Sequence, residues 1–181
     1  VVMQMHAVLQ NPSWYLGNMA LGVLSEVSEH FPIYAQSRVI PMLQKHFQDD
    51  KQQTPENVKV ALTKALPMMS TKAPATIPGA LEILVHLVGD LEQAPPVLAN
   101  ALEAIKNILA CKAVSGHRLA ALQDLSRCII SCQYSGDAEV REQAVGAARA
   151  LLNWMNKRQG TEDTYQLTRK QLKATFPSIA N

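Results

Sequence analysis

The sequence is poor in aromatic residues, in glycine and in net charge. Phe, Trp and Tyr make up 5% of the 181 residues, whereas Ala and Leu are abundant, a bias that favours close-packed helices over strands. The formal net charge of +2 argues neither for nor against nucleic acid as a partner. Glycine occurs 8 times, and the chain contains no phosphate-cradling loop, nucleophile elbow or dinucleotide fingerprint. We therefore expect a non-catalytic protein that holds no cofactor.

Cysteine and long apolar runs are also scarce. Cys111, Cys128 and Cys132 are odd in number and none belongs to a Cys-x-x-Cys motif, which indicates a reduced, intracellular protein of the cytoplasm or nucleus. No uninterrupted apolar run approaches the ~20 residues that span a bilayer. The chain begins at Val1 rather than Met, and its first residues lack the basic region of a signal peptide. We expect a fragment of a longer chain.

One segment, Asp137 to Lys157, carries the clearest helical pattern. Asp137 is placed to cap the helix with its carboxylate at the positive end of the dipole, and Arg141 is expected to form an ion pair with it. Small residues such as Ala144 and Gly146 let a neighbouring helix approach closely. The apolar positions recur at three- and four-residue steps and predict one buried stripe: Val140, Ala144, Ala147, Leu151, Trp154 and Met155.

The rest of the chain divides into further helices separated by proline, glycine or polar turns. Pro41 and Pro67 lie inside helical patterns, so we expect a kink or a later helix start at Pro41 and a bend at Pro67. Thr54 is expected to cap the helix that follows it. The expected helices cover residues 1–10, 14–30, 33–47, 55–73, 76–91, 95–114, 119–133, 137–157 and 161–176.

Helix openings and breaks recur at one period. The longer helices open at Pro12, Pro55, Pro96 and Asp137, and the breaks between hairpins fall at Pro32, Pro74 and Gly116. Successive members of both sets are separated by about 42 residues, which is the scale of a repeated helical unit. An unrelated helical bundle has no reason to keep one period over three intervals, and short connections make sequential helices antiparallel. The spacing therefore predicts an array of helical hairpins.

The pattern Asp-x-x-Val-Arg-x-x-Ala at residues 137–144 resembles the second helix of a HEAT repeat. The observed period falls within the ~40–47 residues of HEAT and armadillo repeats, and the choice between these two types stays open. The resemblance implies an all-α fold, an α-solenoid (superhelix) of about four antiparallel hairpins plus a terminal helix. We predict a single HEAT/ARM-like repeat domain over residues 1–181, with hairpins at about 1–31, 33–73, 76–114 and 117–158 and an extra helix at 161–176.

Two rows of polar side chains follow when the longer helices are aligned by the period, because positions one period apart lie side by side in stacked repeats. The basic row consists of Lys64, Lys106 and Arg149, and the amide row consists of Asn57, Asn100 and Gln143, each with one period between successive members. The second helices of HEAT-type repeats usually line the concave surface. We therefore predict that the basic row binds an acidic or phosphorylated segment of a protein partner, while the amides hold an extended backbone.

The HEAT resemblance implies a non-catalytic scaffold or adaptor that binds proteins along its helical surface. The two ends of the predicted array lack polar capping helices, so we expect a larger multi-subunit assembly. An alternative is a nucleic-acid-binding solenoid that grips phosphates through the basic row and the tail residues Arg169, Lys170 and Lys173. A helical-bundle enzyme or cofactor carrier is a third hypothesis, and it needs an apolar pocket with converging polar groups.

Two smaller features have ordinary structural explanations. Cys128 and Cys132 share a helix face, but zinc needs two more ligands, so we expect small buried residues and no metal. Trp14 begins a helix at a hairpin turn and loosely resembles the exposed turn tryptophan of tubulin-binding TOG arrays. Those arrays carry basic residues on such turns, whereas Asp49 and Asp50 make the next turn acidic. We expect Trp14 to pack in the core.

Overall fold

The computed structural model describes residues 13–48, 54–111, 122–157 and 163–179, together with Gln4, Val8 and Leu9. These residues form helices and helical turns, and none of them lies in a strand. The elements are α2 (Trp14–His30), α3 (Pro32–Tyr34), the π-helical turn η1 (Ala35–Val39), α4 (Ile40–Gln48), α5 (Glu56–Lys72), the 3₁₀ turn η2 (Pro74–Thr76), α6 (Ile77–Gly89), α7 (Pro95–Ala110), α8 (Leu122–Cys132), α9 (Ala138–Lys157), α10 (Asp163–Thr175) and the 3₁₀ turn η4 (Pro177–Ile179).

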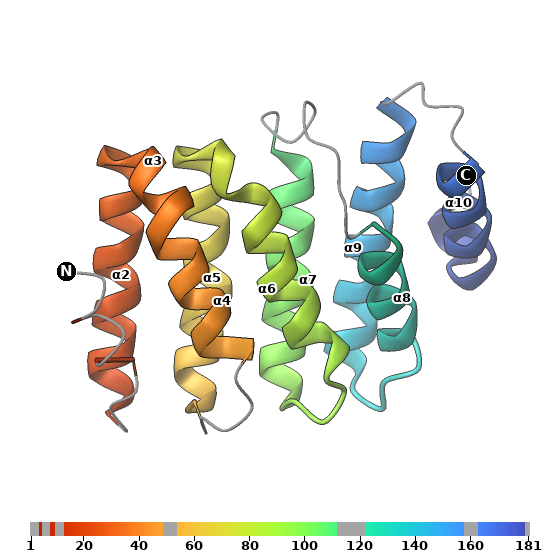
Figure 1. Ribbon diagram of the computed structural model, residues 1–181. Coiled ribbons are helices and arrows are strands. Elements are labelled where there is room, and N and C mark those ends of the chain that lie inside the picture. The colour runs from red at the N-terminus through yellow and green to blue at the C-terminus, as the bar shows by residue number, and fades with distance from the viewer. Residues whose placement is uncertain are drawn as a thin grey trace.

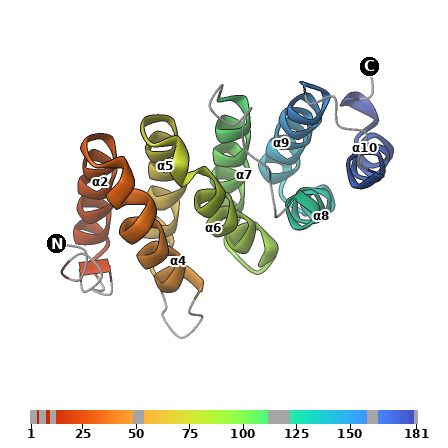
Figure 2. The ribbon, with the colours of Figure 1, turned by 45° about the horizontal axis from the view of Figure 1, so that its top comes forward.

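The helices form two layers that run along one open array. Helices α2, α5, α7 and α9 pack side by side in chain order, and we call them the second-helix layer. Helices α4, α6, α8 and α10 form the first-helix layer, which covers one face of the other (Figure 1). Figure 2 shows the same two rows from a turned view, with α2 and α10 at opposite ends. The array therefore does not close into a bundle.

The core lies between the layers and along the seams within the second-helix layer. Every residue of the stripe predicted on α9, from Val140 to Met155, is buried, which confirms that pattern. Helix α7 packs along α9, and fully buried alanines such as Ala101 and Ala144 lie on the two helices. Because small side chains allow a short distance between axes, this seam buries backbone as well as side chains.

Pro41 coincides with a change of helix geometry. The amide of Ile40 donates to the carbonyl of Ala35, five residues earlier, so the preceding turn is π-helical. Proline has no N–H and its ring crowds the carbonyl four residues before it, and a π turn widens the helix at that point. Helical residues run without a break from Pro32 through η1 to Gln48, so the irregularity expected at Pro41 is a widened turn and not a later helix start. Helix α5, in contrast, continues through Pro67 to Lys72.

One of the two predicted helix caps is present. Asp137 Oδ1 accepts a hydrogen bond from the amide of Val140 at 3.0 Å, which confirms the cap of α9. The cap predicted at Thr54 is wrong, because Pro55 occupies the N-cap position and no side chain caps α5. The hydroxyl of Thr54 instead lies 3.4 Å from His46 Nε2.

The ion pair predicted between Arg141 and Asp137 is also wrong. The guanidinium of Arg141 donates to the carbonyl of Ser135 at 2.7 Å. That carbonyl belongs to the turn before α9, and the Asp137 carboxylate is already engaged as the cap. A half-buried arginine has several donors to satisfy, and a fixed carbonyl within reach binds it without the cost of holding a second side chain in place.

Several predictions fall outside the described residues. They are most of the helix over residues 1–10, the acidic turn at Asp49 and Asp50, the break at Gly116 and the packing of the Trp14 side chain. The single domain over residues 1–181 and its hairpin boundaries stay a prediction. None of the helices described is both long and apolar enough to cross a bilayer.

Two glycines provide a matched test of the packing between α4 and α6. A Cβ at Gly79 of α6 would overlap Cγ2 of the buried Ile40, whereas a Cβ at Gly22 of α2 would meet nothing within 4 Å. Alanine favours a helix over glycine by ~1 kcal/mol, so Gly22→Ala should stabilise by up to that amount. Gly79→Ala should destabilise by about 1–3 kcal/mol because Ile40 has no room to move aside.

Urea unfolding followed by circular dichroism measures both free energies. Equal stabilisation by the two substitutions would show that α4 and α6 are not in the close contact described here. Ile40→Ala combined with Gly79→Ala should cost less than the sum of the two single substitutions, since the overlap is then gone.

Candidate functional site

The predicted basic and amide rows lie on three adjacent helices of the second-helix layer. Asn57 and Lys64 are on α5, Asn100 and Lys106 on α7, and Gln143 and Arg149 on α9. Asn57, Lys64 and Arg149 are exposed, whereas the other three are half-buried. Packing of α5 on α7 and of α7 on α9 places each row across two seams. Their role in binding a partner stays a prediction.

Lys106 is engaged within the fold. Its ammonium donates to Gln143 Oε1 at 3.2 Å and lies 3.6 Å from the carboxylate of Glu103. Its side chain crosses the seam, because a Cβ added to Gly146 of α9 would lie 3.3 Å from Lys106 Cδ. Lys106 therefore fills the seam between α7 and α9 and links the basic row to the amide row.

The central amide is also used internally. The side-chain amide of Asn100 donates to the carbonyl of Pro96 at 2.7 Å, within the first turns of α7. Lys64, Asn57 and Arg149, in contrast, make no hydrogen bond or ion pair with any other described residue. The residues of the two rows therefore differ in how far their polar groups are already used. The residues whose polar groups are unused lie on α5 and α9.

An open groove of about 600 Å³ runs between α2 and α5. Its apolar lining comprises Leu21, Val60, Ala61, Ala65 and Met68, and its polar lining comprises Asn18, Ser25, Glu26, Asn57 and Lys64, with Gly22 between them. Two predicted residues, Asn57 and Lys64, therefore share one groove. Within it, Asn18 Oδ1 and Ser25 Oγ are buried and have no hydrogen-bond partner. Buried polar atoms are normally paired, and these two are not.

An exposed ion-pair network joins α2 to α5 and includes Glu26, a lining residue of this groove. The ammonium of Lys72 on α5 hydrogen-bonds the carboxylate of Glu29 on α2 and lies 3.9 Å from that of Glu26. This hydrogen bond lowers the pKa of Glu29 and raises the pKa of Lys72. Glu26, Glu29 and His30 offer ligand atoms within 4.8 Å of one another, but the cation already present is the Lys72 ammonium. The group links two helices and is not proposed as a metal site.

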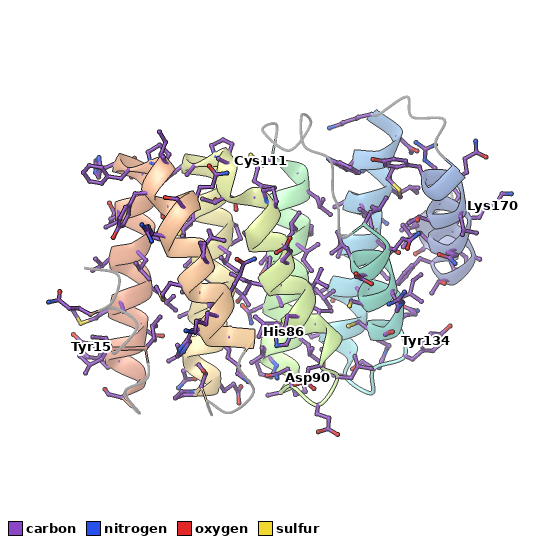
Figure 3. All side chains as sticks on the ribbon, viewed as in Figure 1. Tyr15, His86, Asp90, Cys111, Tyr134 and Lys170 are labelled. Carbon is purple, nitrogen blue, oxygen red and sulfur yellow. The ribbon has the colours of Figure 1, made fainter. Side chains whose placement is uncertain are left out.

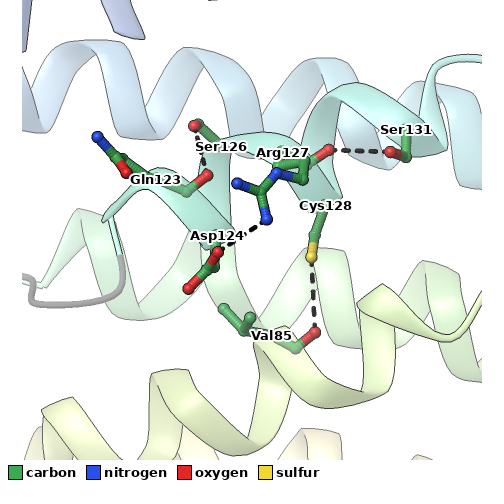
Figure 4. A network of polar contacts seen from close by, with 7 residues as sticks. All are labelled: Val85, Gln123, Asp124, Ser126, Arg127, Cys128 and Ser131. Carbon is green, nitrogen blue, oxygen red and sulfur yellow. Dashed lines mark hydrogen bonds and ion pairs between the residues drawn. The ribbon is translucent and has the colours of Figure 1, made fainter. Parts of the chain in front are cut away.

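A second groove of about 570 Å³ separates α8 from α10 in the first-helix layer. Its polar groups are mostly used locally, as Figure 4 shows for α8. Arg127 pairs with Asp124 at 3.0 Å, and the hydroxyls of Ser126 and Ser131 donate to carbonyls of their own helix at 2.9 and 3.1 Å. This groove therefore offers a partner fewer unused polar groups than the groove between α2 and α5.

The two cysteines of α8 have the environment of core residues. Cys132 is buried, and Cys128 is half-buried with its thiol 3.7 Å from the carbonyl of Val85 on α6 (Figure 4). Burial raises the pKa of the Cys132 thiol to about 11. Burial, and to a smaller extent the carboxylate of Asp124, raises the pKa of Cys128. Metal ligation and nucleophilic attack both require the thiolate, which this environment disfavours.

The turns between first and second helices lie along one edge of the array. Figure 3 labels Asp90 and Tyr134 on these turns, whereas Cys111, in a turn of the other kind, lies at the opposite edge. Three large side chains at the first edge are exposed: Tyr15 by 58%, Leu91 by 55% and Tyr134 by 79%. Sequence reasoning singled out only the neighbouring Trp14, although Leu91 and Tyr134 recur roughly one period apart.

Sequence reasoning also missed Gly22 and Lys72. Gly22 precedes Lys64 by one period, and Lys72 follows Glu29 by one period. Extending the period by one unit toward the N-terminus predicts both relationships. Gly22 was missed because the aligned repeats were compared only at positions with charged or amide side chains, and glycine has no side chain.

Comparison with known proteins bears on the fold. No family model matches the chain, and no curated protein matches it. A solved structure described as "Structural Basis of Microtubule Plus End Tracking by XMAP215, CLIP-170 and EB1" is similar, with a TM-score of 0.59 and 18% sequence identity over 97% of this chain and 73% of the other. At this identity the likeness shows the fold alone. The predicted fold class is confirmed, and the chain is an all-α solenoid of stacked helical hairpins.

The buried thiols yield a prediction about reactivity. With its pKa raised from 9.0 to about 11, Cys132 should carry a roughly 100-fold smaller thiolate fraction at pH 8 than an unperturbed thiol. Brief iodoacetamide labelling of the folded chain, read by peptide mass spectrometry, should modify Cys111 well before Cys132, and labelling of Cys132 should rise with pH up to about pH 11. In 8 M urea, roughly the concentration that unfolds small domains, the cysteines should react alike. Equal labelling in the folded chain would contradict the burial of Cys132.

Proposed function

We propose that this chain is a non-catalytic scaffold that binds a protein partner along the exposed face of the second-helix layer. The observation that carries the proposal is the unused polar surface of that face. Lys64 and Arg149 are exposed cations without a carboxylate partner in the described part of the chain. Asn57 and the open groove between α2 and α5 lie on the same face.

The chemistry of this face favours an acidic or phosphorylated segment as the bound element. Lys72 on α5 and Lys106 on α7 are each paired with a carboxylate of the chain itself. Lys64 and Arg149 remain to form charge-assisted hydrogen bonds with a partner. Side-chain amides supply neutral donors and acceptors to an extended backbone. Each contact is modest, and affinity comes from adding several of them along the stacked helices.

The array suits this role because its surface is long and its core is continuous. Helices α2, α5, α7 and α9 pack in sequence, so a linear partner can contact several adjacent helices at once. We further propose that the chain works in the cytoplasm or nucleus, as part of a larger assembly. The cysteine usage supports the proposed compartment.

The nucleic-acid alternative is the weaker hypothesis. Phosphate binding depends on the number of free cations, and Glu103 and Gln143 already engage Lys106. The guanidinium of Arg169 donates to the carbonyl of Met155 and ties α10 to α9. Two of the six cations that this hypothesis uses are therefore committed to the fold.

The proposal is tested by reversing the charge of the basic row. In cross-linking and affinity capture from cells that express the protein, Lys64→Glu, Lys106→Glu and Arg149→Glu together should reduce capture of the main partner at least about tenfold, because repulsion replaces attraction. Cross-links to the wild-type chain should map to α5, α7 and α9.

A control triple variant separates this effect from net charge. Arg38→Glu, Lys45→Glu and Lys170→Glu change the charge equally at exposed positions of η1, α4 and α10, and should leave capture unchanged. Equal capture by both triple variants and the wild type would reject the proposed face. The nucleic-acid alternative would be favoured if the wild type binds RNA or DNA in a salt-sensitive way, and if the triple variant of the basic row loses that binding but still captures the protein partner.

The turn edge supports a second candidate function. Tyr15, Leu91 and Tyr134 are exposed along one edge (Figure 3), and exposed aromatic side chains at turns commonly anchor protein partners. The similar solved structure concerns microtubule plus-end tracking. We propose, as the second candidate, that this edge binds a protein of the microtubule system. The acidic Asp90 and Glu92 on the same edge would have to face basic groups of that partner.

Co-sedimentation with microtubules tests this candidate directly. The chain should pellet with them, and Tyr15→Ser with Tyr134→Ser should reduce pelleting at least about fivefold if both rings are buried on binding. Tyr34→Ser, at an exposed position of α3 away from these turns, serves as the control. A chain that stays in the supernatant would reject the candidate and leave the first proposal intact.

A further inference from the structure

One residue that lines the groove between α2 and α5, Gly22, occupies a position of the basic row. Gly22 precedes Lys64 by one period, just as Lys64 precedes Lys106 and Lys106 precedes Arg149. Gly22 on α2 is therefore the equivalent of the three cations on α5, α7 and α9. It is exposed, and no atom lies within 4 Å of the place where its Cβ would be.

The seam between α7 and α9 shows what a lysine does at this position. Lys106 crosses that seam over Gly146 and reaches Gln143, with 3.2 Å between Nζ and Oε1. The residue equivalent to Gln143 in the seam between α2 and α5 is Asn57, two periods earlier. With Gly22 in place of a lysine, that seam stays uncovered, and Asn57 keeps its amide unused.

Two buried polar atoms beside the uncovered seam have no hydrogen-bond partner. Ser25 is 3% exposed and its hydroxyl has no partner, although Ser28 on the same helix donates to the carbonyl of Leu24 at 2.7 Å. Asn18 Oδ1 is likewise buried and unpartnered. Both residues line the groove. An unpaired buried oxygen destabilises the free protein, and a ligand that donates to it removes this penalty.

Building on the proposed scaffold function, we infer that this groove is the anchor site for the partner's extended segment. It takes one apolar side chain, such as leucine, next to a carboxylate. The apolar side chain lies against Leu21, Val60 and Ala65, and the carboxylate pairs with Lys64. Backbone amides of the segment donate to Asn18 Oδ1 and Ser25 Oγ, and Asn57 binds the segment's backbone.

The charges around the groove determine the type of segment. Lys64 is the exposed cation on its rim, and Glu26 at its far end is drawn toward Lys72, 3.9 Å away. A basic segment would meet the Lys64 ammonium and gain only a carboxylate that is already paired. An acidic segment meets an unpaired cation. The groove of about 600 Å³ lies within the ~300–1,000 Å³ typical of ligand sites.

The test uses fluorescein-labelled nine-residue peptides whose central leucine stands between two glutamates. Binding to the folded chain is measured by fluorescence polarisation. The wild type should bind this peptide at least about tenfold more tightly than versions with alanine for leucine or lysine for both glutamates. Gly22→Lys should weaken binding at least about tenfold, since a lysine there can reach Asn57 and cover the groove. Gly22→Ala should stay within about twofold of the wild type, because a methyl group leaves most of the groove open.

A second variant keeps the inference testable if Gly22→Lys perturbs the helix. Asn18→Leu removes the unpartnered acceptor, so it should weaken peptide binding while leaving the circular dichroism spectrum unchanged and the unfolding midpoint equal or higher. Unchanged affinity in both variants, or equal affinity for the glutamate and lysine peptides, would overturn the inference.

The result is distinguishable from failure of the proposed function. Loss of partner capture in the triple variant of the basic row, with capture retained by Gly22→Lys, would support the face and reject the groove as its anchor. Retained capture by a double variant of Lys106→Glu and Arg149→Glu, in which Lys64 is intact, with loss in Gly22→Lys, would reject the rest of the basic row and support the groove.

Discussion

The structure depends on one constraint: each second helix must pack against the next with the same face and at nearly the same height. Buried alanines make this possible in the seam between α7 and α9, where Ala101 and Ala104 on one helix and Ala144 and Ala147 on the other leave little between the backbones. The constant period of the repeat keeps that register from one hairpin to the next. Layers, seams and surface rows all follow from this spacing, since a slip of one residue would rotate a helix by ~100° and expose its apolar stripe.

The same register explains why the surface is not uniform. Equivalent positions carry Gly22, Lys64, Lys106 and Arg149, and their neighbours decide what each one does. Glu103 lies one turn before Lys106, and Gly146 lies across the seam. The side chain of Lys106 therefore extends over Gly146 and links two helices. Lys64 has no such carboxylate and remains exposed. The surface therefore has a covered seam between α7 and α9 and an open one between α2 and α5.

Sequence reasoning predicted most of the fold because the signals were redundant. The helix breaks at proline and glycine, the apolar stripes and the period all predicted helices over the same residues. Helix α2, for example, runs from Trp14 to His30 as predicted. The π turn before Pro41 could be foreseen only as an irregularity, because whether a helix kinks, restarts or widens depends on how neighbouring elements hold it. The caps show the same limit. The side chain of Asp137 accepts a hydrogen bond from the backbone of Val140, three residues later, so a local pattern can predict this cap. The hydroxyl of Thr54 instead lies near His46 of the preceding helix, and a local pattern does not reveal that contact.

The candidate site was less accessible to sequence reasoning. The period gave the correct helices for the six predicted residues, but it could not tell that Asn100 would bind Pro96 or that Lys106 would bind Gln143. Such choices depend on side-chain reach of a few ångströms. The groove was missed because it is defined by a missing side chain, and Gly22 is one of 8 glycines in the sequence. A search for similar residues at equivalent positions reveals contacts that repeat along the array. It does not reveal a hairpin, such as the one with Gly22, whose residue at that position differs.

Gly22 also has a consequence for how an array of this kind changes over time. The seam beneath it is built by residues that the core requires, whereas the residue above it is exposed and free to vary. A single codon change at the corresponding position of another hairpin can therefore uncover a new cleft there, and the reverse change can close the old one. The binding position can move along the molecule in steps of one hairpin while the packed interior stays the same.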